Sequence, residues 1–63
     1  MNEAKTFMNR YKNEVNDINF IMTALDQSDA ISEQNYETET TFWFFHDGSY
    51  IEINNLSICI GEN

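Results

Sequence analysis

Apolar residues recur in the first third of the chain at the spacing of one helical face. They stand three or four residues apart, and the interior of this segment contains neither Gly nor Pro. The stripe consists of Ala4, Met8, Tyr11, Val15, Ile18, Met22 and Leu25, and Phe7 and Ile21 widen it. This period predicts one amphipathic helix over residues 3–25, with Asn2 as its N-cap. So wide a stripe suits packing on a sheet, and Phe20, which lies off the stripe, needs some other cover.

The segment 26–35 is polar apart from the pair Ala30 and Ile31. We interpret it as an acidic loop that places Ile31 in the core. A single helical turn capped by Ser28 or Asp29 is the alternative.

The hydrophobic period changes to two at residue 36. Residues 36–46 are rich in Thr and aromatic side chains, which predicts a first strand. Asp47-Gly48 signals a two-residue type I′ turn, because both positions of that turn need a positive φ. Residues 49–53 then form a second strand. Asn54-Asn55 predicts a weaker turn of the same kind, followed by a third strand over residues 56–60.

These two turns fix the register of the predicted sheet. They place Phe44 opposite Ile51 across the first turn, and Ile53 opposite Leu56 across the second. One face then carries no charge and consists of Phe42, Phe44, Ile51, Ile53, Leu56, Ile58 and Ile60. Since this face and the helix stripe would cover each other, the sequence predicts one α+β domain over residues 1–63. Its architecture is a helix packed on a three-stranded antiparallel meander, in the order α-β-β-β.

The other face of the predicted sheet mixes acids with aromatic residues. It carries Glu37, Glu39, Thr41, Trp43, Phe45, Tyr50, Glu52, Ser57 and Cys59. Trp43, Phe45 and Tyr50 would form an apolar patch of a few hundred Å², since each aromatic side chain can bury about 150–250 Å². A patch of this size typically marks an interface, here a homodimer seam or a partner site. The alternative is that Phe20, Ile31 or the loop covers it.

The charges are unevenly divided along the chain. Lys and Arg number 3 against 11 Asp and Glu, for a formal net charge of -8. Residues 1–25 sum to zero, whereas residues 26–63 contain acids and no Lys or Arg. So few cations exclude a module that binds nucleic acid directly. The acids of the second part are Asp26, Asp29, Glu33, Glu37, Glu39, Asp47, Glu52 and Glu62.

The spacing of the first five of these acids suggests a row of phosphate surrogates. Three or four residues separate neighbours on a helical turn, and two residues separate neighbours on a strand. We therefore take Asp26, Asp29, Glu33, Glu37 and Glu39 as candidate partner-binding residues, joined by Glu52 and by the aromatic patch. The alternative is that the acids only keep a small protein in solution.

Catalytic residue types are scarce. His46 and Cys59 are the single His and the single Cys, and the predicted register puts them on opposite faces, which excludes a Cys–His pair. A triad would have to use His46, Asp47 and Ser49 at an unshielded turn. No metal-binding or Gly-rich phosphate-binding spacing is present. We expect no enzyme activity, no cofactor and no metal site.

The sequence also favours a cytoplasmic protein that does not bind membranes. A lone cysteine cannot form the intrachain disulfide that short secreted domains commonly need. The first residues lack the apolar segment of a signal peptide. The longest dense apolar run, residues 42–45, is far shorter than the roughly 20 residues of a membrane span.

Two functions fit these features. In size, acidity and lack of catalytic groups the chain resembles phage-encoded DNA mimics, which include inhibitors of uracil-DNA glycosylase, of restriction enzymes and of CRISPR effectors. The resemblance is to a general plan, and no motif carries functional residues over. It implies inhibition of a basic nucleic-acid-binding protein, in the host cytoplasm if the chain is phage-encoded. The alternative is a dimeric, non-catalytic scaffold or regulatory module.

Overall fold

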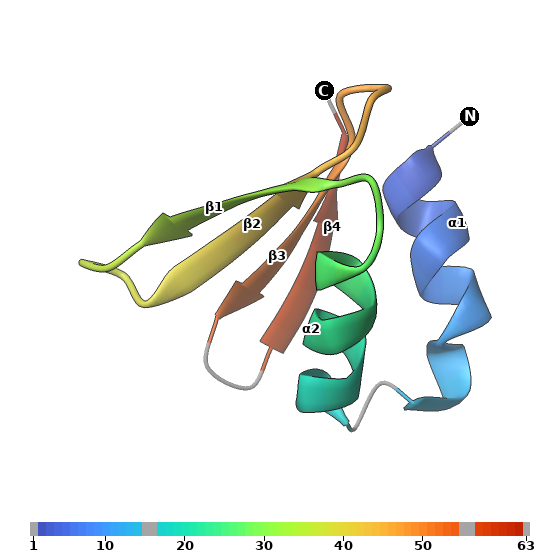
Figure 1. The fold of residues 1–63 in the computed structure, drawn as a ribbon, viewed down its shortest axis with the longest axis horizontal. Helices are drawn as coiled ribbons and strands as arrows, with labels where there is room; N and C mark the ends of the chain where they lie inside the picture. Colours follow the sequence, from blue (N-terminus) through green and yellow to red (C-terminus); the bar gives the residue numbers. More distant parts are fainter. Residues whose placement is uncertain (1, 15–16, 55–56, 63) are drawn as a thin grey trace.

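Two helices and an antiparallel sheet make up the fold in the computed structural model, which describes residues 2–14, 17–54 and 57–62 (Figure 1). The helical part comprises α1 (Glu3–Arg10), a short 3-10 turn (Lys12–Glu14) and α2 (Ile18–Asp26). The strands are β1 (Ile31–Asn35), β2 (Thr40–Phe44), β3 (Tyr50–Asn54) and β4 (Ser57–Gly61), paired in that order. The predicted helix on an antiparallel meander is confirmed in outline, but the sheet has a fourth strand and the helix is in two parts.

The predicted single helix is wrong because α1 ends at Arg10 and a separate helix, α2, begins at Ile18. Asn2 caps α1 as expected, accepting from the Lys5 N–H at 2.9 Å. Asp17 caps α2 in the same way, accepting from the Phe20 N–H at 3.1 Å. Short polar side chains favour such caps over helix interiors. A straight helix over residues 3–25 would be about 34 Å long, longer than the 31 Å greatest extent of the molecule.

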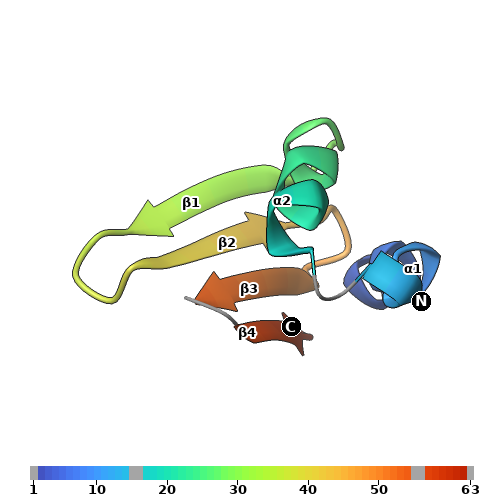
Figure 2. The same cartoon turned by 90° about the horizontal axis from the view of Figure 1, so that it is seen from below.

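Because α1 and α2 are separate helices, both halves of the apolar stripe reach the sheet. In Figure 2 the two helices lie at one end of the strands, with α2 over β2. Most members of the predicted stripe are buried or half-buried, whereas Val15 lies outside the described residues. The buried core consists of Ala4, Phe7, Met8, Ile21, Leu25, Trp43, Ile51 and Ile53. Phe20 is half exposed and packs edge-on against Tyr11, so its cover comes from the helical side.

Strand β1 corrects the predicted acidic loop, and residues 36–39 form a turn instead of the start of a strand. The Asn35 side-chain oxygen accepts from the backbone N–H of Glu37 at 3.0 Å and of Thr38 at 3.4 Å. Glu39 closes the turn with a φ of 53°. Every residue of β1 is exposed, so no apolar alternation marked it as a strand. Ile31 is 69% exposed and does not enter the core.

The β2–β3 turn has three residues, 46–48, where two were predicted. The Phe45 N–H donates to the Ser49 carbonyl at 2.9 Å, and the Gly48 N–H donates to the Phe45 carbonyl at 3.1 Å. Gly48 has a φ of 88°, which fits a type I turn followed by a left-handed residue. The extra residue shifts the register by one, so that Trp43 pairs with Ile51 and Phe44 with Tyr50.

A shift of one residue turns the side chains of β2 to the opposite face of the sheet. Trp43, expected on the uncovered face, is 2% exposed in the core, where its Nε1 donates to the Asp26 carboxylate at 3.1 Å. Phe42 and Phe44, expected in the core, lie on the other face. In β3–β4, Ile53 pairs with Ile58 instead of Leu56. That shift of two keeps the face, and Leu56 and Asn55 lie outside the described residues.

The β2–β3 turn is joined to the start of α1 by hydrogen bonds. The Asp47 carboxylate accepts from the Glu3 N–H at 2.7 Å, and the Glu3 carboxylate accepts from the Asp47 N–H at 3.1 Å. The Ser49 hydroxyl donates to Asp47 and accepts from the buried Ala4 N–H at 3.0 Å. The Ser49 hydroxyl, with the backbone N–H groups of Glu3 and Ser49, lowers the pKa of Asp47. Asp47 therefore serves a structural contact.

We expect Ser49→Ala to lower the free energy of unfolding by about 1–3 kcal/mol, because it leaves the buried Ala4 N–H without an acceptor. Urea denaturation followed by circular dichroism measures this change. Ser32→Ala, at an exposed position of β1, is the control and should change stability by less than about 0.5 kcal/mol. Equal midpoints for the two variants would contradict the role of the Ser49 hydroxyl.

The lowered pKa of Asp47 predicts the sign of a pH effect. The carboxylate stabilises the fold above its unfolded pKa of about 3.9, and this contribution is lost as the pH falls through the lower folded pKa. We expect stability to fall less in Asp47→Asn than in the parent protein when the pH drops from about 5 to about 2.5. Urea midpoints over this range test the prediction, with Glu39→Gln as the control. Parallel pH profiles for the parent and Asp47→Asn would refute it.

Candidate functional site

The face of the sheet turned away from the helices is the candidate site. Because strand side chains alternate and Trp43, Ile51 and Ile53 lie in the core, their neighbours in sequence point to the opposite side. We call this side the open face. Its members are Ile31, Glu33, Asn35, Thr40, Phe42, Phe44, Tyr50, Glu52, Asn54, Ser57, Cys59 and Gly61.

Three aromatic rings cluster at the centre of the open face. Phe42 and Phe44 stack with centroids 5.8 Å apart and planes 15° apart. Tyr50 lies 6.0 Å from Phe42 and 5.7 Å from Phe44. The Tyr50 ring also covers Gly61, since a Cβ there would come within 2.0 Å of the ring. All three rings are half-buried, so part of their apolar surface remains available to a partner.

Carboxylates flank these rings. Along one line of paired residues, Phe42 stands between Glu33 of β1 and Glu52 of β3, with Cys59 of β4 beyond. Neighbouring strands lie about 4.8 Å apart, so each carboxylate starts one strand away from the ring. Glu37 adds a further carboxylate from the β1–β2 turn. The open face, defined above, contains no Lys or Arg, because all three basic residues of the chain belong to α1 and the 3-10 turn.

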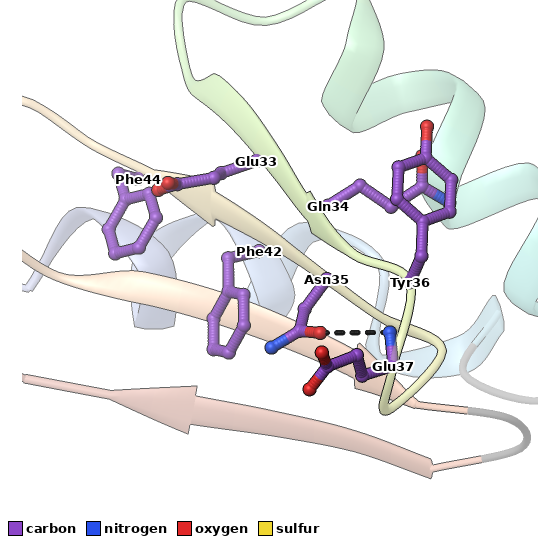
Figure 3. Close-up of a pocket in the computed structure, with 7 residues that line it drawn as sticks. All are labelled: Glu33, Gln34, Asn35, Tyr36, Glu37, Phe42 and Phe44. Carbon is purple, nitrogen blue, oxygen red and sulfur yellow. Dashed lines mark hydrogen bonds between the residues drawn. The ribbon is translucent and has the colours of Figure 1, made fainter.

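A hollow of about 610 Å³, open to solvent, lies at the β1–β2 end of this face. Glu33, Asn35, Glu37, Phe42 and Phe44 line it. In Figure 3 the two phenyl rings stand side by side, with Asn35 and Glu37 next to Phe42. Gln34 and Tyr36 also line the hollow, but they lie farther from the rings in this view.

The predicted row of acids is divided between two sides of the molecule. Glu33, Glu37 and Glu52 belong to the open face or its rim, and Glu39 is exposed in the β1–β2 turn. Asp26 bonds Trp43 on the helical side. Asp29 lines a second hollow beside Arg10 and His46. The acids therefore do not form one continuous ridge.

Of the predicted aromatic patch, only Tyr50 lies on the open face. Trp43 is buried, and Phe45 is half-buried against Phe7, with centroids 6.0 Å apart. Sequence reasoning missed Phe42 and Phe44 because it assumed the shorter turn. If His46-Asp47-Gly48 is taken as a three-residue turn with Gly at the left-handed position, the resulting register places Phe42 and Phe44 on the open face.

The described residues contain no group of three or more His, Cys, Asp or Glu side chains placed to hold a metal ion. His46 lies in the β2–β3 turn, and Cys59 is exposed on the edge strand β4.

None of the helices that the structure describes is long and apolar enough to cross a membrane.

Comparison with protein-family models, with curated proteins and with solved structures finds no match.

Proposed function

We propose that the protein is a small, non-catalytic inhibitor that binds a basic nucleic-acid-binding protein through the open face and takes the place of its nucleic acid. The observation that carries the proposal is an aromatic cluster flanked by Glu33, Glu37 and Glu52 on a face without a cation. The proposal includes a cytoplasmic location, in the host cell if the chain is phage-encoded.

Charge and apolar surface have separate roles in this proposal. The net charge of -8 attracts a basic surface over a distance of about one Debye length and raises the association rate. Phe42, Phe44 and Tyr50 then contact apolar atoms of the partner, which slows dissociation. A protein surface shaped for phosphates offers the required Lys and Arg side chains.

Charge also favours a basic partner over a second copy on this face. A two-fold dimer brings the same patch of both chains together, so the acidic patch with Glu33, Glu37 and Glu52 would lie against a second copy of itself. Like charges facing each other across an interface cost several kcal/mol. The open face contains no Lys or Arg to offset that repulsion.

A dimeric scaffold is the second proposal, and a different surface supports it. The edge strand β4 (Ser57–Gly61) carries no charge, and its Cys59 and Ile60 are exposed. An unprotected sheet edge can pair with the same strand of a second copy. In that case the acidity serves solubility alone.

Competition with DNA tests the first proposal. The protein is immobilised, proteins from a bacterial lysate are bound at low salt, and duplex DNA is used for elution. Purified uracil-DNA glycosylase, a restriction enzyme and a CRISPR nuclease are assayed for inhibition in parallel. We expect binding that DNA displaces and that weakens with ionic strength. Binding indifferent to both, or a sedimentation mass of a dimer without any DNA-displaced partner, would instead support the scaffold.

A further inference from the structure

The hollow on the open face combines aromatic and anionic groups in a way that suits one kind of side chain. Its lining includes the stacked rings of Phe42 and Phe44 and the carboxylates of Glu33 and Glu37 (Figure 3). Aromatic faces attract cations, and Arg more often than Lys makes this contact. The Asn35 oxygen is already engaged by the turn, which leaves the carboxylates as the side-chain acceptors beside the rings, since Gln34 and Tyr36 lie farther from them.

We propose that this hollow binds an arginine side chain of the protein partner. The guanidinium packs against the exposed face of Phe42, and its N–H groups donate to the carboxylate of Glu37 next to that ring, while Glu33 adds a second negative charge to the lining (Figure 3). The inference rests on the proposed function for the source of the arginine, because proteins that bind nucleic acids present arginines to phosphates.

Arginine fits the lining better than lysine for two reasons. Its planar guanidinium stacks on an aromatic ring and still donates from its edge, whereas an ammonium is a compact point charge. Guanidinium is also less strongly hydrated, so its transfer to a half-buried aromatic site costs less. Pairing with a carboxylate through two parallel hydrogen bonds adds directional preference.

Two blocked pentapeptides of equal charge test the site without any protein partner. One carries two arginines separated by glycine, and the other carries two lysines in the same positions. Each is titrated into the protein while NMR follows the ring signals of Phe42 and Phe44 and the amides of residues 33–37. We expect the arginine peptide to shift these signals and to bind about threefold more tightly, or better, than the lysine peptide.

Two variants separate the aromatic and the ionic parts of the site. Phe42→Leu keeps an apolar side chain without a ring and should abolish the preference for arginine. Glu33→Gln with Glu37→Gln should weaken both peptides, whereas Glu14→Gln with Asp29→Asn removes the same charge away from the hollow and should not. If Phe42→Leu does not fold, the comparison of the two double variants still tests the site.

The outcomes distinguish this inference from the proposed function. Equal binding of the two peptides, or arginine-induced shifts confined to residues outside the hollow, overturns the arginine site. A partner displaced by DNA that binds without the hollow also overturns the site and leaves the function standing. Specific arginine binding without any DNA-displaced partner supports the site and contradicts the function.

Discussion

Trp43→Ala is expected to remove about a third or more of the free energy of unfolding. Truncation of a buried Trp typically costs about 3–5 kcal/mol, and a domain of this length is stable by only about 3–9 kcal/mol. Trp43 is 2% exposed, packs among the core residues and bonds Asp26. Its loss would leave a cavity between the helices and β2. Urea denaturation followed by far-ultraviolet circular dichroism measures the effect.

The same experiment tests the register of β2. Tyr36→Ala removes an aromatic side chain that is 81% exposed, and we expect it to change stability by less than about 0.5 kcal/mol. Phe42→Ala and Phe44→Ala, on the half-buried open face, should fall between the two. If Trp43→Ala is mild and the two Phe variants unfold the protein, the two-residue turn is correct and the described register is not.

Reversal of charge on the open face is expected to weaken partner binding about 100-fold. Glu33→Lys with Glu37→Lys places two cations beside the aromatic cluster, where the proposed partner is basic. If each reversal costs about 1.4 kcal/mol of binding free energy, the dissociation constant rises about 100-fold. Titration calorimetry with the partner identified by DNA competition measures the change at low salt and again at high salt.

A control variant separates local from total charge in this prediction. Glu14→Lys with Asp29→Lys changes the net charge by the same amount, but Glu14 lies in the 3-10 turn and Asp29 beside the second hollow. It should slow association slightly and leave the dissociation rate unchanged. Equal losses for the two double variants would mean that the acids act only through the net charge. Undiminished binding of the Glu33 and Glu37 variant would refute DNA mimicry through this face.

The arrangement of the sheet was predictable only as far as the turns were. Hydrophobic alternation correctly paired the faces of β3 and β4, because a register shift of two leaves every side chain on its side. It failed for β2, since aromatic residues occupy both parities from Phe42 to Phe45. Because residues 42–45 are all aromatic, only the turn decides which of their rings enter the core. The contact of Asp47 and Ser49 with α1 favours the longer turn. This contact joins residues far apart in the sequence, so no local pattern reveals it.

The helix break and β1 were hidden for related reasons. A heptad stripe continues through residues 11–17, so periodicity gives no sign of the cap at Asp17. Strand β1 has neither apolar alternation nor buried residues. It forms because the turn that begins at Asn35 reverses the chain, so that β2 pairs antiparallel with β1. Of the predicted acids, Glu33 and Glu52 lie on the open face and Glu37 at its rim, and their role in binding stays a prediction. Their separation from Asp26 and Asp29 required the tertiary structure.

The position of the chain's one tryptophan provides a built-in optical probe. Trp43 lies between the sheet and the helices, with its indole N–H bonded to the end of α2. Its fluorescence therefore reports whether the helices are docked on the sheet. The rings of the open face lie on the opposite side, so a ligand there changes the tyrosine and phenylalanine environment first. Emission spectra can verify that each variant that keeps Trp43 is intact in the same cuvette in which its binding is measured.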